Sequence, residues 1–191
     1  MIDLKDKKLI LASRSPRRQE LLKGLHLDFE IRVKETEEDF PDDMPAGQVA
    51  SFLSEKKALA FEPELKDNEL VLASDTVVVL EGKILGKPAD LKEAKNMLLS
   101  LSGKDHEVIT GFTVLSQTKR VSLIDKAKVT FKLLTEEEMD FYITHFQPFD
   151  KAGAYGIQEW MGFIGVEKLE GSFYTVMGLP VHLVYRVLNE W

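Results

Sequence analysis

The sequence predicts an α/β protein with a mixed, twisted sheet and flanking helices. Short apolar runs typical of strands alternate along the chain with stretches whose apolar residues recur every three or four positions, as in helices. The chain has 191 residues, of which 44% are hydrophobic and 30% charged, which allows a sizeable core beneath a charged surface. Because no repeat array or Gly/Ser-rich linker interrupts the pattern, residues 1–191 are predicted to form a single domain.

The first half of the chain is predicted to alternate strands and helices around an acidic loop. Residues 7–13 are largely apolar and predict a buried strand. Ser15 followed by Pro16 predicts the start of a helix that continues through residues 19–25. The elements expected next are a strand at 28–33, an acidic loop at 34–45, a helix at 46–61, and strands at 70–74 and 76–80.

The second half contains two capping boxes that predict where helices begin. Asp90 with Glu93, and Thr135 with Glu138, each combine an N-cap residue with a glutamate three positions later. Gly103 is a typical residue for ending the first of these helices. The other predicted elements are a tight turn at 81–83, a long strand pair at 106–116 and 119–134, a helix at 137–146, short strands around 163–169, and a last helix after Pro180.

The composition excludes several kinds of function. The chain has no Cys, so disulfides and thiolate metal sites are excluded. Its net charge of −7 argues against general nucleic-acid binding, which depends on a basic face. No apolar run reaches the roughly 18 residues that predict a membrane span, and the first residues lack the order of a signal peptide. We therefore expect a cytoplasmic protein with neither nucleic-acid nor membrane partners.

Two polar clusters follow predicted strands. The segment SRSPRR at 13–18 places three arginines at a helix start, where positive charge opposes the helix dipole, and this indicates an anionic ligand. Asp75 stands between two apolar runs, where an ionised carboxylate is costly to bury without a partner. If the strands at 7–13 and 70–74 are parallel neighbours, their carboxyl ends bring both clusters to one edge of the sheet. The alternatives are a solvated basic turn and an aspartate bonded to local backbone.

Other segments offer groups that bind ions or bases. The acidic run at 35–43 supplies carboxylates suited to a divalent cation, or is simply an exposed loop. Lys57 follows the buried side of its helix, so its ammonium group is expected at the rim. Lys87 precedes a proline in a turn. The segment at 150–158 ends in Gln158, whose amide could read the edge of a base, or it is simply a compact turn.

Four segments in register carry a resemblance to a known family. They are LILASRSPRRQELL, ASDTVVVLEGKILGKP, LSGKDHEVITG and DKAGAYGIQ. Together they closely resemble the Maf family of nucleoside triphosphate pyrophosphatases, over about residues 7–188. The resemblance implies an elongated, two-lobed fold like that of inosine triphosphatases, with a central cleft. It also implies a homodimer that hydrolyses a nucleoside triphosphate to the monophosphate and pyrophosphate with a divalent cation, Mg²⁺ or Mn²⁺.

The resemblance also implies roles for individual residues. Asp75 falls on the catalytic acid, and Glu38 joins it as a metal ligand. The substrate-binding positions fall on Ser13, Arg17, Arg18, Lys57 and Lys87. The positions that choose the base fall on Arg17, Thr76 and Gln158. The motif that ends in Gln158 resembles the branch acting on dTTP and UTP, whereas the 7-methylguanosine triphosphate branch usually carries Glu there.

Two other functions compete with hydrolysis of dTTP and UTP. One is a nucleotide-binding regulator of septum formation that does not need to cleave its ligand. The other is a pyrophosphatase for 7-methylguanosine or other non-standard triphosphates. Glu159 and Trp160 bear on the choice of base, because they stand where the family usually has small residues.

Overall fold

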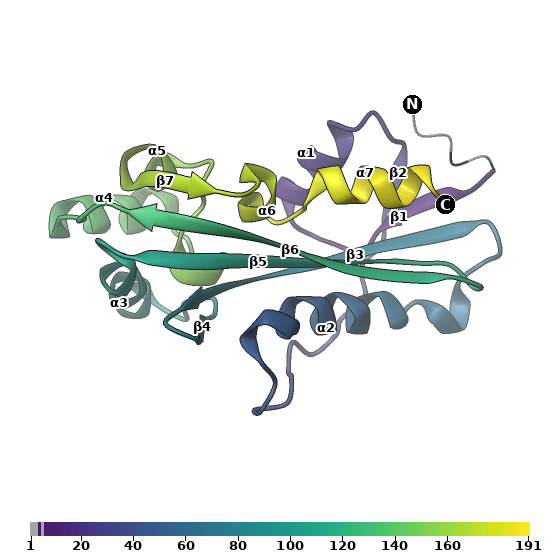
Figure 1. The fold of residues 1–191 in the computed structure, drawn as a ribbon, viewed down its shortest axis with the longest axis horizontal. Helices are drawn as coiled ribbons and strands as arrows, with labels where there is room; N and C mark the ends of the chain where they lie inside the picture. The colour runs from purple at the N-terminus through teal and green to yellow at the C-terminus, as the bar shows by residue number, and fades with distance from the viewer. Residues whose placement is uncertain (1–3, 5) are drawn as a thin grey trace. The chain divides into compact units, whose positions relative to one another are not determined.

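The computed structural model describes Leu4 and residues 6–191, in which helices and strands alternate along the chain (Figure 1). In chain order the elements are β1 (Lys8–Leu11), α1 (Pro16–Lys23), β2 (Phe29–Ile31), α2 (Ala46–Leu59), η1 (Glu62–Glu64), β3 (Glu69–Leu80), β4 (Lys83–Leu85), α3 (Leu91–Leu101), β5 (Asp105–Leu115), β6 (Arg120–Phe131), α4 (Glu136–Phe146), η2 (Ala152–Ala154), α5 (Trp160–Gly165), β7 (Val166–Glu170), α6 (Phe173–Met177) and α7 (Val181–Asn189).

The strands form a mixed sheet, and this confirms the predicted α/β class. The order is β2-β1-β3-β5-β6-β7, with β4 paired to β3. Strand β1 runs parallel to both β2 and β3, whereas β4 and β7 run antiparallel to β3 and β6. Leu11 pairs with Leu72, so the strands at 7–13 and 70–74, whose pairing the sequence left open, are parallel neighbours in the sheet.

The chain divides into two compact units. The first comprises Met1–Asp75, Thr110–Asp125 and Gly178–Trp191, and the second comprises Thr76–Ile109 and Lys126–Met177. Strands β3, β5 and β6 contribute residues to both units. The central cleft implied by the family resemblance stays a prediction.

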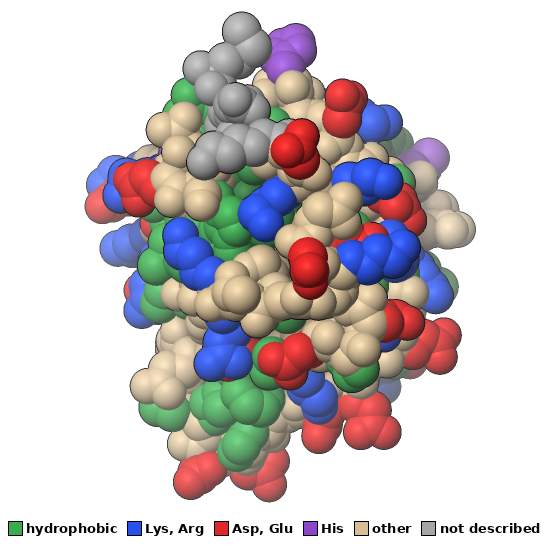
Figure 2. Space-filling model, turned by 90° about the vertical axis from the view of Figure 1, so that its right-hand side faces the viewer, with side chains coloured by type: hydrophobic (Ala, Val, Ile, Leu, Met, Phe, Trp, Pro, Cys, Tyr) green, Lys and Arg blue, Asp and Glu red, His purple; other side chains and the backbone are tan. Residues whose placement is uncertain are grey.

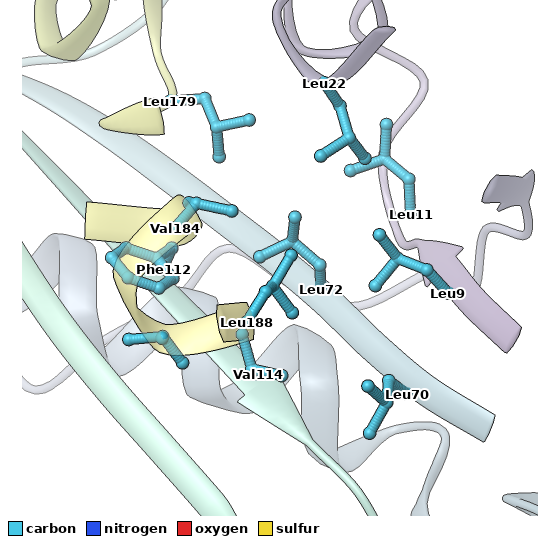
Figure 3. Packing of buried hydrophobic residues seen from close by; sticks show 11 residues of the cluster. Leu9, Leu11, Leu22, Leu70, Leu72, Phe112, Val114, Leu179, Val184 and Leu188 are labelled. Atoms are coloured by element: carbon cyan, nitrogen blue, oxygen red, sulfur yellow. The ribbon is translucent and has the colours of Figure 1, made fainter. Parts of the chain in front are cut away.

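Alternating residues of β1 and β3 fill two cores in the first unit, as the two-residue period of a strand requires. Leu9, Leu11, Leu70 and Leu72 point to one face of the sheet, where they converge with residues of α1 and α7 (Figure 3). The residues between them face a second cluster that includes Ala58 of α2. Helices α1 and α7 therefore cover one face of this part of the sheet, and α2 covers the other (Figure 1).

Local sequence signals set several element boundaries as predicted. Ser15 caps α1, and Thr135 with Glu138 forms a complete capping box at α4. The predicted turn between β3 and β4 places Glu81 and Gly82 at positive φ, as a tight two-residue hairpin turn requires. These signals depend only on neighbouring residues, which is why they could be read from the sequence.

One predicted region was partly wrong. Short strands were expected around 163–169, but residues Trp160–Gly165 form helix α5 and only Val166–Glu170 form a strand. The short helix α6 (Phe173–Met177) was not expected at all. A short apolar run does not distinguish a strand from a buried helical turn, because both bury the same residue types.

The surface carries charges of both signs. On the face that Figure 2 shows, Lys and Arg side chains are interspersed with Asp and Glu side chains. That face therefore lacks the continuous basic patch that general nucleic-acid binding uses. Among the described residues, none of the helices combines the length and apolar character needed to cross a membrane.

His106 is buried in the second unit, where one of its ring nitrogens is bonded to Tyr155. Its Nε2 lies 2.7 Å from the hydroxyl oxygen of Tyr155, and its ring packs edge-on against Phe131 and Tyr155. Within the described residues, its Nδ1 is buried and has no hydrogen-bond partner. Burial lowers the pKa of His106 to about 4, because a charged imidazolium would lose its hydration there.

We expect the protein to lose about 3 kcal/mol of stability through His106 alone as the pH falls from about 6.5 to about 4. The unfolded chain takes up a proton near the ordinary histidine pKa of 6.5, whereas the folded protein takes it up only near 4. The contribution of His106 to the free energy of unfolding is therefore fully present above pH 6.5 and is lost as the pH falls toward 4. Urea unfolding of the wild type and of His106→Gln across this range measures the difference in pH dependence.

The variant should lose this component of the pH dependence. His145→Gln changes an exposed histidine and should keep the wild-type dependence. If His106→Gln showed the same pH dependence as the wild type, His106 would not be the group that titrates.

Candidate active site

Asp75 lies inside a continuous strand rather than at a strand end. Strand β3 runs unbroken for 12 residues, and Asp75 is only 8% exposed within it. The prediction that the strand stops at Asp75 was therefore wrong. An ionised carboxylate can remain at such a place because a basic side chain compensates its charge.

That basic side chain is Lys57, which contacts two carboxylates. Its Nζ donates to Asp75 Oδ1 and, at 2.8 Å, to Glu38 Oε1. Helix α2 points Val49, Ala50, Leu53 and Ser54 into the core, and Lys57 continues this side of the helix one turn further on. Its side chain is 16% exposed, so the ammonium group sits at the rim, as predicted.

The neighbouring pair is different in character. Lys56, which precedes Lys57, contacts Asp39, which follows Glu38. The side chain of Asp39 is 70% exposed. Exposed ion pairs contribute little to stability. Of the two adjacent lysines, only Lys57 therefore joins a buried carboxylate to the acidic loop.

Arg18 belongs to the same cluster. Its Nε donates to the carbonyl oxygen of Gly178 at 2.8 Å. Burial lowers the pKa of the Arg18 guanidinium, whereas the negative charges of Asp75 and Glu38 raise it, and the positive charge of Arg17 lowers it. Arg17 and Arg18 therefore lie near Asp75 in the first unit, as expected for parallel neighbouring strands, and Glu38 of the acidic loop joins them.

Gly178 and Ser74 support this cluster and were not predicted from the sequence. The Ser74 hydroxyl is fully buried beside Asp75 and lies 2.8 Å from the Gly111 carbonyl oxygen and 3.1 Å from that of Gly178. Gly178 has a φ of 111°, which favours glycine. The only sequence signal was the Gly-Leu-Pro triplet before the last helix, which marks a turn but not its partners.

Ser13 orders the turn that carries the arginines. Its Oγ accepts a hydrogen bond from the Ser15 backbone N–H at 3.2 Å, and the Ser15 Oγ accepts one from the Arg18 N–H at 3.5 Å. These bonds use the free N–H groups at the start of α1. A direct contact between Ser13 and substrate stays a prediction.

The remaining predicted residues lie in the second unit. Lys87 is exposed, and the turn that carries it is bonded to the segment at 150–158, because the Gly153 N–H donates to the Gly86 carbonyl oxygen at 3.0 Å. Thr76 and Gln158 are partly exposed. Their roles in binding substrate and choosing the base stay predictions.

Trp160 packs on helix α4. Its ring centroid lies 4.8 Å from that of Phe141, in a tilted arrangement. The indole therefore has an aromatic neighbour within the second unit. The other residue that departs from the family pattern, Glu159, accepts a hydrogen bond from the Tyr142 hydroxyl.

The carboxylates fit one kind of divalent cation. Asp75 and Glu38 share the Lys57 ammonium, and no group of three or more His, Asp or Glu placed to hold a metal occurs in the part of the chain that the structure describes. Mg²⁺ usually takes one or two carboxylates and completes its shell with water and substrate phosphates. Two carboxylates are enough to bind a divalent cation whose other ligands are water and the phosphates of a substrate. They are too few to bind a cation coordinated by protein alone.

Comparison with known proteins places this chain in a family. The family model described as Maf-like protein matches residues 8–191. The chain belongs to the Maf family. Its match extends from β1 through α7 and therefore includes every residue of the cluster around Asp75.

Curated Maf relatives match along nearly the whole chain. A dTTP/UTP pyrophosphatase of Flavobacterium johnsoniae is 51% identical over 97% of this chain and 96% of its own length. Proteins of the same name from Christiangramia forsetii and Parabacteroides distasonis are 46% and 44% identical, over 98% and 99% of this chain and 95% and 98% of theirs. Among solved structures, the Staphylococcus aureus Ham1 protein is 14% identical with a TM-score of 0.46, over 65% of this chain and 72% of that one.

Proposed function

We propose that this Maf protein is a nucleoside triphosphate pyrophosphatase that hydrolyses dTTP and UTP to the monophosphate and pyrophosphate. The observation that carries the proposal is the bridge from Lys57 to Asp75 and Glu38, beside Arg18, since it combines a candidate base with groups that bind a polyphosphate. Relatives that are 44–51% identical along nearly their whole length carry this activity in their names. We further expect a cytoplasmic homodimer, as the family resemblance implies.

Asp75 is the proposed general base. It accepts a proton from the water whose oxygen attacks the α-phosphorus, and the bond from that phosphorus to the α–β bridging oxygen then breaks. The products are the nucleoside monophosphate and pyrophosphate. Lys57 on α2 holds the Asp75 carboxylate of β3 in a fixed position, so the base does not need to be oriented at the moment of reaction.

The basic residues offset the charge that develops on the phosphates. Arg17 and Arg18, at the start of α1, are suited to phosphate oxygens because guanidinium groups donate two parallel hydrogen bonds. Asp75 and Glu38 would hold the divalent cation, which when bound neutralises phosphate charge and polarises the phosphoryl group. In the same reaction, Lys87 is proposed to bind substrate.

Pyrophosphate release from a panel of nucleoside triphosphates tests the proposal directly. With Mg²⁺ or Mn²⁺ present, we expect kcat/KM for dTTP and UTP to exceed the values for ATP, GTP and CTP by at least tenfold. A preference for 7-methylguanosine triphosphate would replace the pyrimidine assignment. Tight nucleotide binding without pyrophosphate release would contradict the enzymatic function and favour the regulator.

A further inference from the structure

The two ends of the Gln158 side-chain amide have different surroundings. Its Nε2 lies 3.4 Å from Glu159 Oε1 and donates to that carboxylate. Its Oε1 is buried and has no hydrogen-bond partner within the residues that the structure describes. The reverse orientation would place the amide oxygen against a carboxylate oxygen, so repulsion keeps the donor end on Glu159. Gln158 is thus left with an unused acceptor.

The Glu159 carboxylate is itself held in place from two other sides. The Tyr142 hydroxyl donates to its Oε2 at 2.5 Å, and the Lys151 ammonium lies 3.1 Å from its Oε1. Both partners are buried: Tyr142 is fully buried, and Lys151 is only 7% exposed. Burial, together with the nearby carboxylate, raises the pKa of Tyr142, so its hydroxyl keeps the proton that it donates.

The backbone at Gly156 packs closely against both side chains. The Tyr142 hydroxyl oxygen also accepts a hydrogen bond from the Gly156 N–H at 3.1 Å. The segment at 150–158 is thus bonded to the hydroxyl that donates to Glu159. A Cβ on Gly156 would lie 2.9 Å from both Gln158 Nε2 and Glu159 Cδ. The segment therefore packs directly against the paired side chains, and the contacts that hold them come from residues of the second unit.

We propose that Glu159 is a positioning residue that makes Gln158 a hydrogen-bond acceptor and so selects bases that carry a ring N–H. This inference rests on the proposed function, in which Gln158 contacts the base. Uracil and thymine present an imide N–H between two carbonyl groups, which donates to the unused Oε1. Cytosine has an unprotonated nitrogen at the same ring position, so two acceptors would face each other. A site built to accept a hydrogen bond rejects an analogue that cannot donate one.

The test is the ratio of kcat/KM for UTP to kcat/KM for CTP, measured by pyrophosphate release in the wild type and in Glu159→Gln. An amide at position 159 both donates and accepts, so Gln158 can turn its own N–H toward the base. We expect the ratio to fall at least tenfold, mainly through a gain with CTP. General damage to the fold would lower both values together and leave the ratio unchanged.

Glu137→Gln is the matched control. It makes the same chemical change at an exposed position in the first turn of α4, and it should keep the wild-type ratio. Tyr142→Phe provides a second reading, because it removes the donor that holds Glu159 and keeps the ring. We expect Tyr142→Phe to lower the UTP/CTP ratio severalfold. This variant therefore still tests the role of Glu159 if Glu159→Gln does not fold.

The outcomes separate this inference from the proposed function. A wild-type protein that releases no pyrophosphate from UTP overturns both. A wild type that prefers UTP, with the ratio unchanged in Glu159→Gln and Tyr142→Phe, overturns the positioning role of Glu159 alone. A fall in the ratio with Glu137→Gln unaffected supports it.

Discussion

Asp75→Asn is expected to lower pyrophosphate release by about 10³-fold while the protein stays folded. The amide has almost the size of the carboxylate, but it cannot take the proton from the attacking water. Lys57 keeps Glu38 as a charged partner in the variant, so its ammonium is not left uncompensated. Initial rates with UTP and saturating Mg²⁺, together with circular dichroism and urea unfolding of the same preparation, measure activity and folding separately.

Asp39→Asn is the matched control. Asp39 follows Glu38 in the acidic loop and pairs with Lys56, but that pair is exposed. Its loss should change activity by less than about twofold, since exposed ion pairs are weak. Near-normal turnover in Asp75→Asn would remove Asp75 from the role of base. An equal loss in both variants would instead indicate an effect of the total charge around the acidic loop.

The sequence predicted the parts of this protein that depend on neighbouring residues. The caps at Ser15 and Thr135 and the hairpin turn at Glu81 and Gly82 each involve contacts within a few positions. The parallel pairing of β1 with β3 was considered only as a condition, and the structure shows that this condition is met. The grouping of the arginines with Asp75 followed from that pairing.

Other parts of the site depend on contacts between distant residues. Asp75 was expected to end a strand, because a carboxylate inside one is costly to bury. Its partner is Lys57, 18 positions earlier on a helix, and pattern reading within one segment does not find such a pair. The Gly178 carbonyl oxygen, which accepts a hydrogen bond from Arg18, is 160 positions away from Arg18 in the sequence. A backbone acceptor has no residue type that would mark it in a sequence.

Gly111 is another residue whose role only the fold explains. It lies on β5 where helix α2 crosses the strand, and a Cβ at this position would lie 2.5 Å from the Ala50 carbonyl carbon and oxygen and from the Ser51 nitrogen. Real Cβ atoms essentially never approach backbone that closely, and backbone atoms of a helix cannot turn aside as a side chain can. A glycine inside a strand typically marks such an approach of another backbone.

Gly111→Ala is therefore expected to lower the free energy of unfolding by about 3 kcal/mol, the upper end of the usual cost of overpacking. Equilibrium urea unfolding measures it. Gly86→Ala is the control, because a Cβ at Gly86 would meet no atom within 4 Å, and we expect it to change stability by less than about 0.5 kcal/mol. A Gly111→Ala protein within 1 kcal/mol of the wild type would show that α2 moves away from the strand at little cost.

The same substitution should also affect catalysis, because Ala50 and Lys57 lie on one side of α2, two turns apart. A helix that is pushed away from β5 at Ala50 carries the Lys57 ammonium away from Asp75 on β3. The Gly111 carbonyl oxygen also accepts a hydrogen bond from the Ser74 hydroxyl, and Ser74 precedes Asp75. The substitution therefore disturbs the positions of both Lys57 and Asp75. We expect kcat for UTP to fall at least tenfold at temperatures where the variant is still folded. A variant that is destabilised but fully active would mean that the position of Lys57 does not depend on how closely α2 packs on the sheet.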